Sequence, residues 1–389
     1  QLYLMLKSNP EVMKGLVKYL SKGWDKASGE INTQEELDVD TTGILHITKP
    51  LRERKSMNKD VDIIPKPLLE KQAALFTDDI RRLLIYKEKL PRAVFIDYLR
   101  ILCGLHLALY TMKVVYLLPK MIDAGTRNVD DDWSLVVDLT DNLDSIVSQF
   151  ACKDIERMEN SYGKYIRATY MVDIIQKRKR CDVDEAFRIL KEDNNKQGEY
   201  YEKELNDIED SLPNSDEKEF DKNDFHEMLE FFPEKDYFDM FVHVLEKSNL
   251  GASQYKYIHD FVDAVCMKNS SSMLLADSRS KRHPRRGALG SKLLETMVQL
   301  LVLKEKSNGG YETRSLSIDE LAKAIRERYG LIINGIGEER FADADVEMNA
   351  AFRVNMDAFK NKLRQIGFYT DMSDACILQK IRPRYKLED

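Results

Sequence analysis

Residues 355–366 read NMDAFKNKLRQI, and the apolar side chains in this stretch recur at intervals of three, four and three. That spacing predicts one face of an α-helix, made of Met356, Phe359, Leu363 and Ile366. The opposite face and its flanks are polar and carry Asp357, Lys360, Asn361, Lys362, Arg364 and Gln365. Because Asn, Gln and Arg can form paired hydrogen bonds with base edges in a major groove, this face predicts binding to double-stranded DNA.

The segments around this helix predict two further helices and a hairpin. Residues 291–304 have helical periodicity, and residues 311–316 are expected to be extended. Ser317 and Glu320 have the spacing of a capping box at the start of a second helix, which Gly330 ends. The 355–366 helix is followed by two expected strands, at residues 368–370 and 375–381.

This order of helix, strand, helix, helix and hairpin resembles a winged helix. The resemblance implies that Asn361, Arg364 and Gln365 face the DNA groove. It also implies that three cations just past the hairpin, Arg382, Arg384 and Lys386, reach phosphates.

Residues 331–354 depart from the winged-helix pattern. They place an acidic insertion where a short turn is expected between the second and third helices. Winged helices also serve as protein-interaction modules, so a scaffold whose C-terminal domain binds a partner protein is the alternative hypothesis.

The composition predicts a mainly α-helical protein with several domains. The chain has 389 residues and is 43% hydrophobic, which is enough to bury a sizeable core. Breaks in the apolar pattern predict a helical N-terminal domain, an acidic linker with a helical subdomain, a basic linker and the winged-helix-like domain. Their ranges are 1–191, 192–268, 269–287 and 288–389.

Charge is unevenly distributed along the chain. The net charge is −7, yet residues 279–389 carry 21 Lys and Arg against 16 Asp and Glu, and residues 182–239 carry 21 acidic residues against 7 basic ones. Phosphate affinity comes from local basic patches, so the basic end predicts a nucleic-acid contact. The basic linker is expected either to follow a phosphate backbone or to be a simple tether, and its cations include Lys281, Arg282, Arg285 and Arg286.

The first part of the chain is predicted to be helical. Residues 1–20 suggest two short helices or one entered at Asn9 and Pro10, and residues 28–67 suggest a long irregular connection. Two long helices are expected at residues 68–89 and 91–121. The second is apolar on nearly all sides, but its charged residues favour a buried helix over a membrane span. His106 on this helix is predicted to be a hydrogen-bonded core residue.

No motif predicts a catalytic centre, a metal site or a cofactor. The five cysteines are too widely spaced for a zinc site, and the sequence lacks the phosphate-loop and hydrolase signatures. Residues 130–132, three consecutive Asp residues, raise a metal-dependent nuclease as a third hypothesis. Three further Asp residues between positions 138 and 144 recur every third residue, which is typical of a solvated helix face.

A large helical chain without a motor or nuclease signature, ending in a winged-helix-like unit, is similar in outline to accessory subunits of prokaryotic DNA restriction or defence assemblies. The resemblance implies a DNA-binding accessory or regulatory subunit without catalytic activity, located in the cytoplasm. Its expected partners are double-stranded DNA and other protein subunits, with no cofactor and no membrane.

Overall fold

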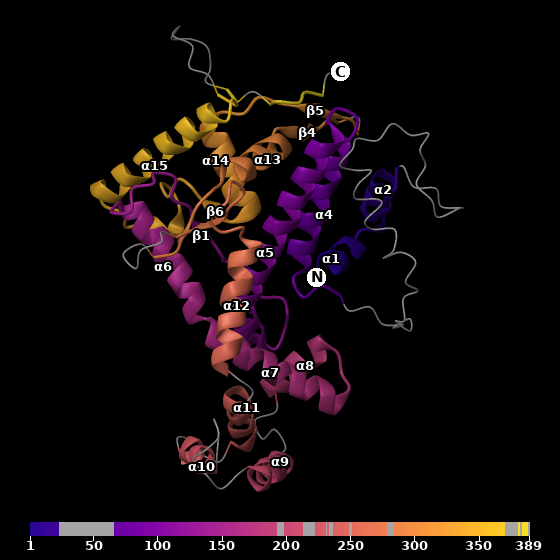
Figure 1. The fold of residues 1–389 in the computed structure, drawn as a ribbon, viewed down its shortest axis with the longest axis vertical. Coiled ribbons are helices and arrows are strands. Elements are labelled where there is room, and N and C mark those ends of the chain that lie inside the picture. Colours follow the sequence, from indigo (N-terminus) through magenta and orange to yellow (C-terminus); the bar gives the residue numbers. More distant parts are fainter. Residues whose placement is uncertain are drawn as a thin grey trace. The chain divides into compact units, whose positions relative to one another are not determined.

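The computed structural model describes residues 1–22, 66–192, 198–212, 222–230, 232, 236–248, 251–277, 284–307, 309–369, 380–381 and 383–387. Helices make up most of this part of the chain, and its strands are two or three residues long (Figure 1). The predicted mainly α-helical class is therefore confirmed.

The chain forms two compact units, each built from separated segments. Unit 1 contains residues 1–110, 134–155 and 265–389, and unit 2 contains residues 111–133 and 156–264. Charge follows this division, because unit 1 has 41 Lys and Arg against 36 Asp and Glu, whereas unit 2 has 19 against 31. Unit 1 thus carries a net charge of +5 and unit 2 a net charge of −12.

Unit 1 begins with α1 (Leu2–Lys7) and α2 (Pro10–Leu20), which both pack against α4 (Glu70–Ile85). The side chain of Asn9 accepts a hydrogen bond from the amide of Val12 and so caps α2, which confirms a helix entered at Asn9 and Pro10. The predicted irregular connection 28–67 lies outside the described residues, except for its last two.

The long apolar helix predicted for residues 91–121 is α5 (Arg92–Ala124). By length and composition alone it could cross a membrane, but 67% of its most apolar window is buried inside the protein, as is typical of a core helix. Its residues up to Tyr110 belong to unit 1 and the others to unit 2. In unit 1, His106 is fully buried and lies within hydrogen-bond distance of Gln72 and Asp79, which confirms its predicted place in the core.

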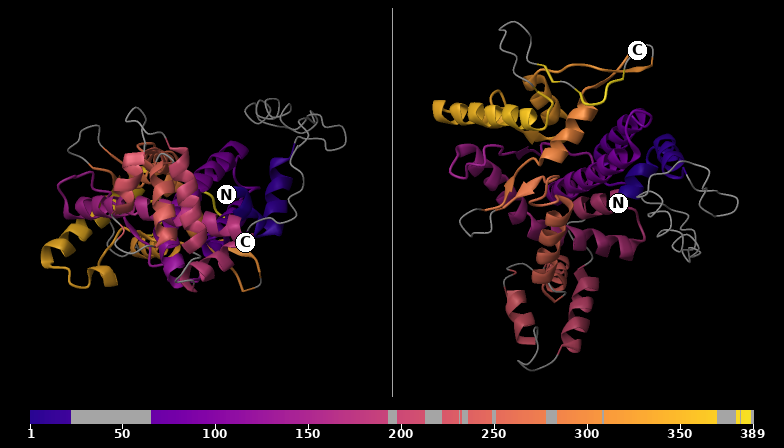
Figure 2. Two further views of the ribbon diagram at one scale, coloured as in Figure 1. Left: turned by 90° about the horizontal axis from the view of Figure 1, so that it is seen from below. Right: turned by 45° about the horizontal axis from the view of Figure 1, so that its top comes forward.

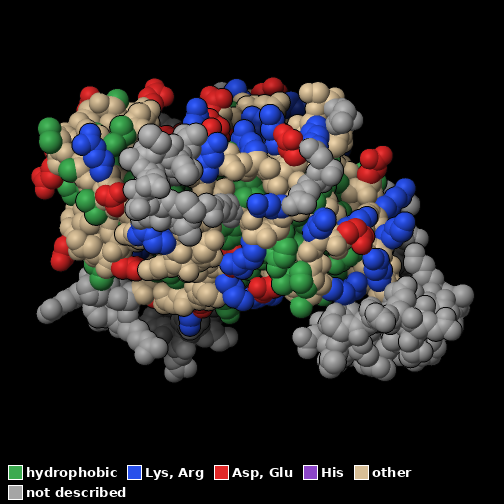
Figure 3. Space-filling model, turned by 90° about the horizontal axis from the view of Figure 1, so that it is seen from above, with side chains coloured by type: hydrophobic (Ala, Val, Ile, Leu, Met, Phe, Trp, Pro, Cys, Tyr) green, Lys and Arg blue, Asp and Glu red, His purple; other side chains and the backbone are tan. Residues whose placement is uncertain are grey.

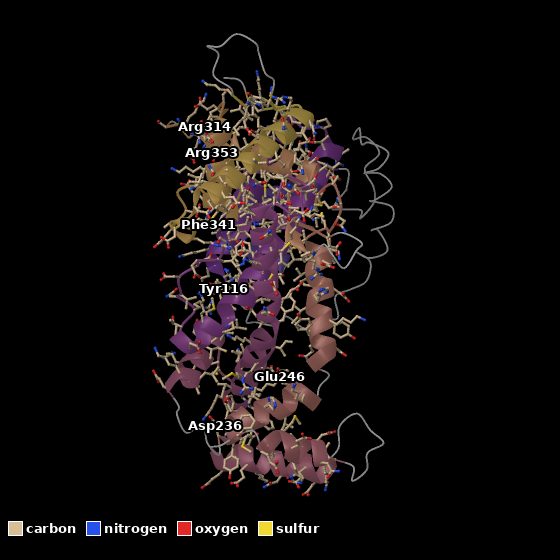
Figure 4. All side chains as sticks on the ribbon, turned by 90° about the vertical axis from the view of Figure 1, so that its left-hand side faces the viewer. Tyr116, Asp236, Glu246, Arg314, Phe341 and Arg353 are labelled. Atoms are coloured by element: carbon tan, nitrogen blue, oxygen red, sulfur yellow. The ribbon has the colours of Figure 1, made fainter. Side chains whose placement is uncertain are left out.

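Unit 2 contains the end of α5, part of α6 (Ile146–Asn160), and the helices α7 (Tyr162–Lys179), α8 (Val183–Glu192), α9 (Gly198–Ser211), α10 (Lys222–Glu230), α11 (Tyr237–Ser248) and α12 (Gly251–Val265). Arg167 of α7 pairs with Asp239 and Glu246 of α11 at 3.0 and 3.8 Å, and Glu246 is labelled in Figure 4. The basic residues 177–180 lie at the C-terminal end of α7, a position that the helix dipole favours for cations.

The C-terminal part of unit 1 follows the predicted order of helices. It contains α13 (Ser291–Leu301), the antiparallel strands β4 (Leu303–Glu305) and β5 (Tyr311–Thr313), and α14 (Ile318–Tyr329). Ser317 and Glu320 form the predicted capping box, and Gly330 ends α14 with a φ of 76°, in the left-handed region. The third helix, α15 (Val346–Gln365), begins well before its predicted start at Asn355. Residues 370–379, most of the predicted hairpin, lie outside the described residues.

Residues 331–354, which intervene where a winged helix has a short turn, help to build the core of unit 1, while most of their acidic side chains are exposed. In this stretch, β6 (Leu331–Ile332) pairs in parallel with β1 (Leu135–Val136), and the short 3₁₀ helix η1 (Glu339–Phe341) precedes α15 (Figure 1). Ile332, Phe341 and Phe352 pack in one buried cluster with Val136 and Val147. Several apolar residues of this stretch are buried because they pack against partners from residues 134–155.

Candidate nucleic-acid interface

α15 has one buried and one exposed face, as its apolar spacing predicts. Phe352, Asn355, Phe359 and Leu363 are the buried residues of the helix. The exposed residues are mostly polar and are Val346, Glu347, Ala350, Arg353, Val354, Asp357, Asn361, Arg364 and Gln365. Because α15 lies at the surface of unit 1 (Figure 2), this polar face is turned to solvent.

The last two turns of α15 gather cations around an aromatic ring. Lys360 Nζ lies 5.4 Å from the centre of the Tyr369 ring, and the guanidinium carbon of Arg364 lies 5.8 Å from it, which fits cation–π contacts. Arg364 Nη1 donates a hydrogen bond to Asn361 Oδ1 at 2.9 Å. We call Lys360, Asn361, Arg364 and Gln365 the α15 polar cluster. Its members come together on one helix face, and all but the half-buried Lys360 are exposed.

Arg353 adds a cation outside the predicted DNA contacts. It lies two turns before Lys360 on the exposed side of α15 and is labelled in Figure 4. From Arg353 to the end of the helix, Asp357 is the one acidic residue. Figure 3, seen from above the view of Figure 1, shows Lys and Arg side chains mixed with Asp and Glu side chains on that face. The C-terminal part of α15 is therefore more basic than its start.

Two residues predicted to contact DNA form hydrogen bonds or ion pairs within unit 1. Lys362 Nζ donates to the backbone carbonyl of Leu289, and burial lowers the pKa of Lys362 against the opposing effect of nearby carboxylates. Arg384 pairs with Glu295, and its Nη2 donates to the carbonyl of Ile366 at 3.0 Å. Lys362 is half-buried and Arg384 is exposed, so only Arg384 could also reach a phosphate.

The predicted phosphate contacts from the basic linker and the chain end are not seen beside α15 in the part of the chain that the structure describes. Lys281, Arg282 and Arg382 lie outside those residues, and Arg285 is half-buried. Arg286 is only 7% exposed, with Nε 3.0 Å from Asp138 and Nη2 3.6 Å from Asp141. Because Arg286 neutralises a buried carboxylate beside β3 (Arg286–Gly287), its expected role at a phosphate is replaced by a structural one.

Asn355 helps to orient α15, a role that was not predicted from the sequence. Its Nδ2 donates to the carbonyls of Val137 at 2.9 Å and Ile333 at 2.8 Å, and its Oδ1 accepts from the amide of Leu139 at 2.9 Å. The side chain is fully buried. The sequence did contain a signal for this role, because Asn355 lies at helical spacing from Phe352 and Phe359 on the apolar face. A polar side chain buried on such a face is usually hydrogen-bonded.

The acidic run considered for a metal-dependent nuclease forms ion pairs instead. In unit 2, Asp131 lies 2.6 Å from Lys113 Nζ, and Asp132 lies 2.9 Å from Lys120 Nζ. Burial raises the pKa of Asp132, but hydrogen bonds from Lys120 and Tyr116 outweigh it, so the pKa is lowered. Within the described ranges no three His, Cys, Asp or Glu side chains are grouped as a metal site.

Comparison with known families places nearly the whole chain in one group. The family model described as "Methylation-associated defense system protein MAD7" matches residues 1–385. No curated protein matches the chain. The match overturns the resemblance to a winged helix confined to the last quarter, because the rest of the chain is recognised as part of the same family. It confirms the expected defence role in its general form.

Proposed function

This chain belongs to the family of the methylation-associated defense system protein MAD7, and we propose that it is a DNA-binding accessory subunit of such a system. The α15 polar cluster is the observation that supports this proposal. It presents one guanidinium, one ammonium and two amides on an exposed helix face whose opposite side is fixed in the core.

The residue types of the cluster suit both parts of duplex recognition. Lys360 and Arg364 supply charge for phosphates, whereas the side-chain amides of Asn361 and Gln365 each have a donor and an acceptor that complement the N7 acceptor and N6 donor of adenine in the major groove. Arg364 is positioned by its hydrogen bond to Asn361, and Lys360 and Arg364 both contact the Tyr369 ring. These contacts reduce the side-chain conformational entropy that Lys360 and Arg364 would lose on binding DNA. A helix of this length, about 30 Å, fits lengthwise in a groove about 12 Å wide.

The net charge of +5 on unit 1 favours approach to a polyanion, whereas Asp357 and Glu347 oppose it locally. Glu347 lies in the first turn of α15 and Asp357 in its middle. The contact is therefore expected at the C-terminal end of the helix and not along its whole length.

A protein-binding scaffold is the second candidate, and two exposed aliphatic residues of α15 favour it. Val346 is 87% exposed and Val354 is 56% exposed on the same helix. Exposed aliphatic side chains suit a protein partner better than a phosphate backbone. On this reading the α15 face would bind protein and the chain would show no affinity for DNA at low salt.

A mobility-shift titration with duplex DNA at several salt concentrations tests the proposal. Replacing Lys360 and Arg364 together by Ala is expected to weaken binding and to reduce the slope of log K against log salt by about two. The matched control replaces two exposed lysines, one in α4 and one just after it (Lys71→Ala with Lys87→Ala), and should leave the slope unchanged. Equal binding by both double variants, or no binding by the unmutated chain at low salt, would reject the DNA-binding role.

A further inference from the structure

We propose that one side of α12, in unit 2, is a docking surface for a basic amphipathic helix of another protein. Tyr257 is 68% exposed and Phe261 is 45% exposed, and a spacing of four residues places both rings in one row along the helix. Ala264, on the next turn of the same row, is also exposed. We call Tyr257, Phe261 and Ala264 the α12 apolar row.

The contacts that hold α12 in unit 2 use other sides of the helix. Val262 is fully buried, Tyr255 packs edge-on against Tyr162 with ring centres 5.2 Å apart, and Gln254 Nε2 donates to the Tyr170 hydroxyl at 2.5 Å. The rings of the apolar row are thus not needed to anchor the helix. Among the described aromatic residues, none is more exposed than Tyr257. Large rings left in water along one line are typical of a surface that a partner covers.

Charge identifies the chemistry of that partner. Unit 2 has 31 Asp and Glu against 19 Lys and Arg, and the exposed charged residues of α12 that border the apolar row are Lys256 and Asp260, the latter with its side chain 61% exposed. The field of these carboxylates extends about 8 Å at physiological salt. A partner with Lys and Arg beside its apolar residues is attracted to the row, whereas DNA and anionic membrane surfaces are repelled.

The spacing of the two rings favours a helical partner. Tyr257 and Phe261 are one turn apart, and a helix that binds in this way inserts apolar anchors at positions i, i+3, i+4 and i+7. Tyr is also enriched among the residues that dominate binding energy, because it offers a large area with few rotamers to fix. The inference rests on α12 alone and is independent of DNA binding by α15, which lies in unit 1.

Fluorescence anisotropy of labelled synthetic peptides bound to the full chain tests the inference. The probe is a helical peptide with a Leu row flanked by Lys, and its charge-reversed partner has Glu in place of every Lys. The test variant replaces Tyr257 and Phe261 by Ser, and the control replaces Tyr3 and Val17 by Ser, two exposed apolar residues of unit 1. Because all four side chains are exposed, each variant should keep the circular dichroism spectrum of the unmutated chain.

The cationic peptide is expected to bind the unmutated chain and the control with the same Kd, and the test variant roughly ten-fold or more weakly. The Glu peptide should not bind. The inference is overturned if the cationic peptide fails to bind the unmutated chain, if the test variant binds as well as the control, or if both peptides bind equally. The test variant should keep the DNA mobility shift of the unmutated chain, so failure of one proposal does not imply failure of the other.

Discussion

Arg328 on α14 donates from Nε to Asp79 on α4 at 3.0 Å, and the Asp79 side chain has no exposed surface. Asp79 Oδ2 also lies 2.8 Å from His106 Nε2 and accepts from the Tyr329 hydroxyl at 2.9 Å. The adjacent Asp78 accepts hydrogen bonds from three guanidinium groups, those of Arg81, Arg82 and Arg328. This network joins α4, α5 and α14 inside unit 1, so the two carboxylates should control its stability.

The substitution Asp79→Asn is expected to lower the free energy of unfolding by up to about 3–5 kcal/mol, because it removes the more deeply buried of the two carboxylates that pair with the largely buried guanidinium of Arg328. The midpoint of urea unfolding, followed by circular dichroism, measures the effect. Glu327→Gln is the control, because its exposed pair with Lys323 is 3.7 Å long and should contribute less than about 0.5 kcal/mol. A midpoint for Asp79→Asn equal to that of the control would show that the network adds nothing to stability.

Acid should destabilise unit 1 through the same two carboxylates. Burial raises the pKa of Asp79, but hydrogen bonding and charge from His106 and Arg328 outweigh it, and the pKa of Asp78 is lowered by its three arginines against the effect of burial. Since the folded pKa values are below the unfolded value of about 3.9, the stabilisation is present above that pH and is lost as the pH falls toward the folded values. Urea midpoints between about pH 2 and pH 5 should therefore fall with pH less steeply in Asp79→Asn than in the unmutated chain.

Removing the amide of Asn355 should loosen the attachment of α15 to the strand region. In Asn355→Ala the amide of Leu139 and the carbonyls of Val137 and Ile333 lose their partner, at roughly 1–3 kcal/mol for a buried polar group left unpaired. Hydrogen exchange at the Leu139 amide is the direct measurement and should become faster. Asn361→Ala, the same substitution on the exposed face of the same helix, should leave that exchange rate unchanged. Slow exchange at Leu139 in both variants would contradict the role of Asn355.

Gly287 allows β3 to approach residues 135–136 closely. A Cβ atom at this position would lie 2.3 Å from the carbonyl oxygen of Val136 and 3.1 Å from Leu135 Cγ, which the backbone cannot accommodate without moving. Gly287→Ala is therefore expected to destabilise the chain by about 1–3 kcal/mol in urea unfolding. Gly163→Ala in α7 is the matched control, because no atom lies within 4 Å of its added Cβ and an alanine favours the helix by about 0.5–1 kcal/mol. The two substitutions should shift the midpoint in opposite directions.

The features that sequence could predict are those whose signal and structure are close together in the chain. Ser317 and Glu320 cap α14 because they are three residues apart, and Gly330 ends that helix because its φ is positive. The spacing of Phe359 and Leu363 placed the polar residues of α15 on the exposed side for the same local reason.

The features that sequence missed depend on residues far apart in the chain. Leu331 of β6 pairs with Leu135 of β1, and Arg286 forms an ion pair with Asp138. Both strands are only two residues long, so neither contact produces a periodic pattern in the sequence. Residues 331–354 contain more apolar than acidic residues, but nothing in the stretch itself indicated that partners from residues 134–155 would bury several of them. Arg286 was predicted to lie at the surface because its partner Asp138 is far away in the sequence, whereas in the fold its charge balances that buried carboxylate.

Asn361 and Lys360 should affect DNA binding in different ways if the α15 polar cluster enters a groove. Asn361→Ala removes an amide that can pair with a base edge. The difference in binding free energy between the best and the worst duplex sequence should therefore shrink by about 1–3 kcal/mol, with little change in the salt slope. Lys360→Ala removes a phosphate contact, so it should weaken binding to all sequences alike and reduce the slope by about one. Titrating each variant with a panel of duplexes at two salt concentrations separates the effects. If Asn361→Ala weakens all sequences equally, α15 binds the phosphate backbone and does not read the bases.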